Sequence, residues 1–396
     1  MRKQLILSEI VMKRNLILGV MMMVVGMAAA QENGGATGTY QVAQAMLAAT
    51  KPQCAFNPDM AASEFDAWQQ SVSDAMATLM CHPTMPEHIS AQCVSRQQMR
   101  GYVREHWQFF PMLGCKVSFI VLKPDGITQP TPAVMCIPGS GMTMEAICDT
   151  VPSRRNWAEQ IVKEGFIAVA VENACAGTQQ DEDLAPGSFD YNTPSRILLE
   201  LGWSWLGYTS YCQRQVLQWM REQSEIRADR ICVAGFSLGT EPLMVLGALE
   251  KDIYAFVYND FLCNTQERAI VLTKDNDQHA RPFPNSIRHL IPNWWRYFNF
   301  PDVVASLAPR YLIMTEGGLD RDFNLVRRAY ELSGHPERLE QHHYPKYADP
   351  ASRSALTELP RDIDRDTFYR LANVDGPNHY FKSHLILPWL TTILRQ

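Results

Sequence analysis

Short apolar runs alternate with longer amphipathic stretches from residue 116 to the end of the chain. The apolar runs predict strands over residues 133–137, 166–171, 230–236, 253–259 and 311–315. Residues 116–123 alternate like a strand, and residues 339–345 are also strand-like. The stretches between them have apolar residues at helical spacing and predict helices over residues 154–165, 196–222, 238–250 and 321–333. A last helix is predicted over residues 385–394, with Pro388 in its first turn. Strands separated by helices form βαβ units, so we expect an α/β fold with a mostly parallel central sheet and helices on both faces.

The chain before this alternating part has a different pattern. Residues 62–80 predict a helix whose apolar stripe packs on the main domain; the stripe consists of Phe65, Trp68, Val72, Met76 and Leu79. We therefore expect a helical N-terminal extension over residues 31–112 and a main domain over residues 113–396. Within the main domain, residues 261–309 interrupt the alternation and are rich in aromatic side chains. Such an insertion is either a lid over a site or an ordinary packed connection.

The first thirty residues have the pattern of an export signal. Lys13 and Arg14 precede an apolar run over residues 16–27, and three alanines follow at 28–30. The order of basic, apolar and small residues is typical of a cleaved signal peptide, and the apolar run is short for a membrane span. The polar stretch before Met12 suggests that translation starts at Met12. We therefore expect residues 1–30 to be removed, and an exported protein, periplasmic or secreted, with no stable membrane span.

Composition excludes some functional classes. The net charge is −6 and the isoelectric point is about 5.9, which disfavours a nucleic-acid binder because such proteins present a basic face. The ten cysteines allow disulfides in an exported chain, but their pairing cannot be assigned from spacing. The chain has no CxxC pair and no HExxH motif, so we expect neither a zinc site nor another cofactor.

One motif carries recognisable chemistry. Residues 235–239 read Gly-Phe-Ser-Leu-Gly and are the single GxSxG match in the chain. The motif follows a predicted strand and precedes a predicted helix, which is the setting that exposes a serine hydroxyl on a sharp turn. The flanking glycines leave room for the crowded backbone. Ser237 is therefore the predicted nucleophile, and a tight glycine turn with a surface serine is the alternative.

A serine nucleophile needs a base, and the base needs an acid to orient it. Two acids, Glu316 and Asp320, lie in the loop after the predicted strand 311–315, at the sheet edge where parallel strands present their chemistry. We choose Asp320 over Glu316 because its position in the loop suits the orienting role better. Asp320 would equally suit the N-cap of the following helix. His379 is the predicted base because it lies in a loop between the last strand and the last helix.

The reaction also needs donors for the oxyanion that forms when serine attacks an ester carbonyl. The backbone N–H of Leu238, directly after the nucleophile, is the first expected donor. The second is expected from the glycine-containing loop 138–141 after the strand 133–137, and we choose the N–H of Ser140.

Ser237, Asp320 and His379 occur in the order serine, acid, histidine, and together these residues resemble the α/β-hydrolase superfamily over roughly residues 110–396. Within it, the chain is similar to bacterial acetyl-xylan-esterase-like and dienelactone-hydrolase-like proteins. The helical N-terminal extension, the loop EGGLD at 316–320 and the sequence GPNHYF at 376–381 support this resemblance. Pro138 is a departure, because many members have histidine there.

The resemblance implies an exported serine esterase that removes acetyl or methyl ester groups from plant-type polysaccharides or oligosaccharides. The alternatives are a dienelactone-hydrolase-like enzyme, a peptidase-type serine hydrolase, or a catalytically dead binding protein on the same fold. Trp294 and Trp295 could stack on sugar rings, or could be core residues. Arg281 could bind a uronate carboxylate, or could be an ordinary solvated side chain.

Overall fold

The computed structural model describes residues 38–396 except 113, 182, 185–188 and 275–286. The chain divides into two compact units, residues 1–51 and residues 52–396. The described part of the first unit holds helix α2 (Thr39–Ala49), none of whose residues is buried. The predicted signal peptide at 1–30 lies outside the described residues. Among the helices that are described, none is both long enough and apolar enough to cross a bilayer.

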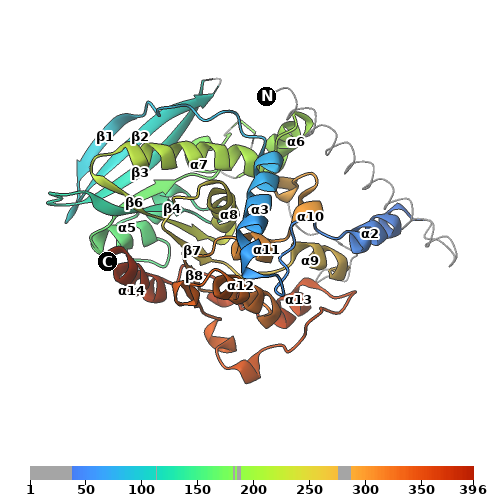
Figure 1. Ribbon diagram of the computed structural model, residues 1–396. Coiled ribbons are helices and arrows are strands. Elements are labelled where there is room, and N and C mark those ends of the chain that lie inside the picture. The colour runs from blue at the N-terminus through green and yellow to red at the C-terminus, as the bar shows by residue number, and fades with distance from the viewer. Residues whose placement is uncertain (1–37, 113, 182, 185–188, 275–286) are drawn as a thin grey trace, which may run out of the picture. The chain divides into compact units, whose positions relative to one another are not determined.

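The second unit is built on one mixed sheet, which has nine strands in the described residues (Figure 1). The strands are β1 (Gln92–Gln98), β2 (Tyr102–Met112), β3 (Cys115–Pro124), β4 (Thr131–Ile137), β5 (Ile167–Val171), β6 (Ile226–Phe236), β7 (Ala255–Asn259), β8 (Tyr311–Met314) and β9 (Leu339–Gln341). Their order across the sheet is β1-β2-β3-β5-β4-β6-β7-β8-β9. Strands β5, β4, β6, β7, β8 and β9 pair in parallel, whereas β1, β2 and β3 form an antiparallel edge. The predicted α/β fold with a mostly parallel sheet is confirmed.

Side chains alternate between two apolar cores along each central strand. In β6, for example, Val233 faces one core, while Cys232 and Ala234 face the other. The first face is covered by α3 (Phe65–Met80), α7 (Trp205–Glu222), α8 (Thr240–Leu249), α11 (Phe300–Ala305) and α12 (Asp320–Leu332). The opposite face is covered by α4 (Met144–Ile147), α5 (Trp157–Lys163) and α14 (Ser383–Leu394). The remaining α-helices are α6 (Asn192–Glu200), α9 (Thr265–Val271), α10 (Trp294–Tyr297) and α13 (Arg365–Leu371).

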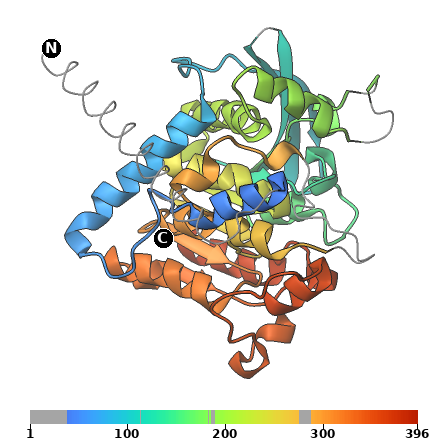
Figure 2. The same ribbon diagram turned by 90° about the vertical axis from the view of Figure 1, so that its right-hand side faces the viewer.

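The predicted helix over residues 62–80 corresponds to α3, which packs against α7 and α8 (Figures 1 and 2). The extension over 31–112 is not helical throughout, however, because its last part forms β1 and β2. The sequence of β1 does not predict a strand, because all seven of its residues are exposed and most are polar. β1 and β2 therefore belong to the sheet of the main domain.

Two further helix predictions were wrong in detail. The predicted helix 196–222 is two helices, α6 and α7, separated by a turn in which Gly202 has a φ of 80°. Pro388 lies inside α14 and not in its first turn, because the helix begins earlier, at Ser383. Proline there removes a hydrogen bond to the carbonyl of His384, and both residues are exposed, so water can take the place of that bond.

All ten cysteines are free thiols in the structure, and seven of them are buried. Buried cysteine commonly serves as a small apolar side chain. The cysteines of the central strands, Cys136 and Cys232, pack in the apolar core under α5 and α14.

Candidate active site

Ser237 lies on the tight turn that joins β6 to α8. Its backbone has a φ of 50°, in the left-handed region that non-glycine residues rarely adopt. The turn needs glycine on both sides: a Cβ on Gly235 would lie 2.5 Å from the carbonyl oxygen of Gly239, and a Cβ on Gly239 would lie 2.3 Å from that of Ile137. Strain of this kind persists only where the surrounding structure holds it. The sequence-predicted turn is therefore present, with the serine side chain partly exposed.

Ser237 and His379 line the same pocket, which has a volume of about 390 Å³. His379 follows the short 3₁₀ turn Gly376–Asn378, in the loop before α14. The ring of Phe236, the residue before the serine, stacks on the imidazole at a centroid distance of 4.9 Å. The predicted nucleophile and the predicted base thus line one pocket, although they are 142 positions apart in the sequence.

The acid beside His379 is Glu316. Its Oε2 lies 2.6 Å from Nδ1 of His379, and the carboxylate is fully buried. Tyr344 donates to the same oxygen at 2.6 Å, and the ammonium group of Lys382 donates to Oε1 at 2.8 Å. An imidazole whose Nδ1–H is held in this way presents its Nε2 as the free base.

The charges around this pair favour ionised Glu316. Burial alone would raise the pKa of the Glu316 carboxyl, but the hydrogen bond and charge of His379, together with Lys382, outweigh burial and lower it. Burial likewise opposes a proton on His379. The hydrogen bond to Glu316 and the negative charge of Asp260 outweigh it and raise the pKa of His379 above 6.5. The carboxylate therefore stabilises the imidazolium that would form during proton transfer.

The structure does not support the choice of Asp320 as the acid, because Asp320 contacts other residues than His379. Asp320 is the first residue of α12, where its Oδ1 accepts a hydrogen bond from Arg353 at 2.7 Å and lies 3.3 Å from Nε2 of His343. Glu316 comes soon after the end of β8 and stays at the sheet edge. The chain then turns away through Gly317, where a Cβ would lie 2.0 Å from the carbonyl oxygen of Asn373. Asp320 consequently starts a helix and does not face His379.

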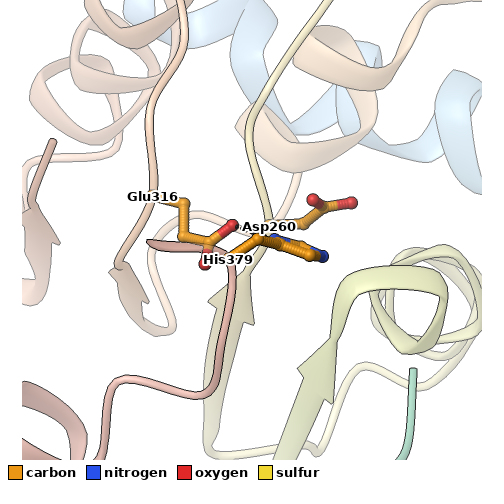
Figure 3. A group of neighbouring side chains, drawn as sticks. All are labelled: Asp260, Glu316 and His379. Atoms are coloured by element: carbon orange, nitrogen blue, oxygen red, sulfur yellow. Dashed lines mark hydrogen bonds and ion pairs between the residues drawn. The ribbon is translucent and has the colours of Figure 1, made fainter. Parts of the chain in front are cut away.

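A second carboxyl group, which the sequence analysis missed, lies beside His379. Asp260 directly follows β7, and one ligand atom each from Asp260, Glu316 and His379 lies within 4.8 Å of the others (Figure 3). Burial is the main cause that raises the pKa of Asp260 to about 7. The spacing of these three ligand atoms would suit a metal ion. However, both carboxylate oxygens of Glu316 already accept hydrogen bonds from Lys382 and Tyr344, and the positive charge of Lys382 would repel a cation. We therefore interpret the group as part of a proton-handling network.

Replacing Asp260 by asparagine is expected to move the acid limb of the pH profile of kcat/KM to lower pH. His379 must be neutral to accept a proton, and loss of a neighbouring negative charge lowers its pKa, so the neutral form persists to lower pH. The profile should be measured with a neutral aryl ester. Asp229→Asn, which changes an exposed carboxylate paired with Arg227 and Arg230, is the control and should leave the limb in place. An unmoved limb in folded Asp260→Asn would show that the carboxyl does not act on His379.

The loop after β4 lies against the nucleophile, as the prediction of an oxyanion site requires. A Cβ on Gly139 would lie 3.2 Å from Cβ of Ser237. The N–H of Ser140 has no acceptor among the described residues, and Ser140 lines the pocket. Leu238 is the second residue of the 3₁₀ turn Ser237–Gly239, at a helix start where N–H groups lack intrahelical acceptors. The roles of both N–H groups as oxyanion donors remain predictions.

The predicted substrate-binding aromatic residues lie elsewhere. Trp294 is buried and packs on Phe298 and Phe300, so it is a core residue. Trp295 is partly buried and donates from Nε1 to the hydroxyl of Thr265 at 3.0 Å. Neither lines the pocket of Ser237, and the same holds for every described residue of the insertion 261–309. Arg281 lies outside the described residues.

Comparison with known proteins agrees with this fold. The family described as the Abhydrolase family matches residues 24–392. The chain belongs to this family. The crystal structure of a Bacteroides fragilis protein, provisionally assigned as an acetyl xylan esterase, is 50% identical, with a TM-score of 0.89 over 92% of this chain and 97% of that one. Membership of the family confirms the resemblance to the α/β-hydrolase superfamily, which the sequence analysis based on the order of Ser237, Asp320 and His379.

More distant structures share the fold alone. A glucuronoyl esterase from Solibacter usitatus is 13% identical with a TM-score of 0.50, over 75% of this chain and 94% of that one. The methylesterase BT1017 is 14% identical with a TM-score of 0.50, over 73% of this chain and 60% of that one. The search of curated proteins returned no match.

Proposed function

We propose that the protein is a serine esterase that hydrolyses ester groups on carbohydrates. The observation that carries the proposal is the placement of Ser237: a strained, partly exposed serine between strand and helix opens onto a pocket shared with His379. The imidazole is held at Nδ1 by the buried carboxylate of Glu316. A nucleophile, a base and an orienting acid are the parts that acyl transfer requires.

In the proposed reaction, the hydroxyl of Ser237 attacks the ester carbonyl while Nε2 of His379 accepts its proton. Glu316 keeps Nδ1–H in place and stabilises the imidazolium. The N–H groups of Leu238 and Ser140 donate to the oxyanion. His379 then gives the proton to the leaving alcohol, and water releases the acyl group from serine by the same route.

The finer features of the proposal rest on the relatives and on the N-terminal pattern. Half of the aligned residues are identical to those of the Bacteroides fragilis protein, which supports acetyl esters as the first substrates to examine. The order of basic, apolar and small residues over positions 13–30 supports export of the protein. An exported enzyme would encounter polymeric carbohydrates.

The proposal is tested by incubating the purified protein with acetylated xylan and with methylated pectin, and measuring released acetate and methanol. We expect acetate release, and covalent labelling of Ser237 by a fluorophosphonate probe, located by peptide mass spectrometry. Labelling requires an activated serine, so it separates an enzyme from a binding protein on the same fold. Absence of both labelling and turnover in a folded sample would refute the proposal.

A further inference from the structure

Two arginines line the pocket that holds the candidate nucleophile. Arg154 and Arg155 lie just before α5, and both share the pocket with Ser237 and His379. The pocket lining contains no aspartate or glutamate among the described residues. A basic pocket is unexpected in a protein whose net charge is −6.

Neither guanidinium group has a carboxylate partner among the residues that the structure describes. Ion pairs hold many other arginines of the protein, such as Arg214, Arg221 and Arg321. No ion pair within the described residues involves Arg154 or Arg155, and both are exposed. Their hydrogen-bond donors therefore remain available to a ligand in the pocket.

The surrounding structure places these arginines beside the catalytic loop. The guanidinium group of Arg154 stacks on the ring of Tyr380, and its central carbon lies 4.1 Å from the ring centroid. Tyr380 directly follows His379 in the sequence. Two residues after Arg155 and after His379, respectively, the rings of Trp157 and Phe381 stack with their centroids 4.2 Å apart and an interplanar angle of 10°. The loop is also held from within, because the buried side chain of Asn156 accepts from the N–H of Ser153. The positive charges thus have a supported position next to the reaction centre.

We propose that Arg154 and Arg155 form a binding site for a carboxylate on the substrate, so that the enzyme prefers esters that carry a free carboxylate. This inference rests on the proposed esterase function. Arginine suits the role because its planar guanidinium group can donate two parallel hydrogen bonds to one carboxylate. The carboxylate can belong to the alcohol part of the ester, as in an esterified acidic sugar. It can also belong to the acyl part, as in the half-ester of a dicarboxylic acid.

Matched substrates test the proposal and separate the two sources. For the alcohol side, 4-acetoxybenzoate is compared with the neutral 4-acetoxybenzamide. For the acyl side, the 4-nitrophenyl half-ester of adipic acid is compared with 4-nitrophenyl hexanoate. We expect kcat/KM to be higher for the charged member of at least one pair, and to fall with added NaCl for that member only. The responding pair identifies the side that carries the carboxylate.

The variants Arg154→Gln and Arg155→Gln should each lower kcat/KM for the preferred charged substrate about tenfold, and the double variant should lower it further. The neutral partner should change little, and Arg155→Lys should retain part of the preference, because it keeps the charge but loses the two-pronged geometry. Arg100→Gln, at an exposed position between β1 and β2, is the matched control and should behave as wild type.

Equal effects of the glutamine variants on the charged and neutral substrates would overturn the carboxylate site while leaving the esterase function intact. Equal kcat/KM values within both pairs in the wild-type protein would do the same. Failure of the wild-type protein to hydrolyse any of the four esters would instead count against the proposed function itself.

Discussion

Ser237→Ala is expected to lower kcat for a small aryl ester by a factor on the order of 10⁴ or more. The variant removes the atom that forms the acyl-enzyme, and no other described serine or cysteine combines a strained turn with the pocket of His379. Alanine has the same backbone demands as serine at a φ of 50°, so the turn should persist. Initial rates and the melting temperature should both be measured.

The control for this variant is Ser95→Ala, on the exposed strand β1, which should retain full activity. Loss of fluorophosphonate labelling in Ser237→Ala, with labelling intact in Ser95→Ala, would support the assignment of the nucleophile. Near-wild-type turnover by folded Ser237→Ala would remove the basis of the proposed mechanism.

Glu316→Gln is expected to lower kcat by a factor on the order of 10³–10⁴, whereas Asp320→Asn should change it less than about threefold. Glutamine removes the negative charge that stabilises the imidazolium of His379, and its amide can hold the ring in the wrong tautomer. Asp320 interacts instead with Arg353 and His343. Rates at the optimal pH of each variant give the comparison.

Stability separates the catalytic effect of Glu316 from a structural one. Glu316→Gln leaves the buried ammonium group of Lys382 without its carboxylate, which we expect to cost about 3 kcal/mol of unfolding free energy. The carbonyls of Asn378 and Tyr380 still accept from that ammonium group, so the variant should fold. Chemical denaturation should show a folded native state under assay conditions. A larger loss of kcat in Asp320→Asn than in Glu316→Gln would reinstate Asp320 as the acid.

Local patterns predicted the strands and the nucleophile turn because the cause of each is local. A parallel strand that is buried on both faces has a continuous apolar run in its sequence. Strands β4 and β5 are examples, because every residue of β4 from Ala133 and every residue of β5 from Ile167 is buried. The turn at Ser237 is recognisable since the glycines that relieve its crowding are two residues away on each side. The exposed strand β1 has no such run, and its pattern gave no strand signal.

Residues whose role depends on distant partners were harder to assign. A tryptophan side chain suits both an apolar core and a sugar-binding site, so the sequence does not distinguish the two roles for Trp294 and Trp295. Their contacts in the fold, with Phe298 and Thr265 respectively, make the distinction. Asp260 had an available signal, because it directly follows the apolar run 253–259 at the edge where the chemistry was expected. Arg154 had none, since the Tyr380 ring on which it stacks lies far along the chain.

The sequence by itself determined the α/β class. It also predicted the serine turn at Ser237 and the histidine at 379 that shares its pocket, and it narrowed the candidate acid to two residues of one loop. The tertiary structure alone decided between Glu316 and Asp320. The reason is physical: Lys382 and Tyr344 become neighbours of Glu316 only when β8, β9 and the loop before α14 pack together. The hydrogen bonds and charges of His379 and Lys382 lower the pKa of the buried Glu316 carboxyl despite its burial, and no pattern within the loop itself encodes them.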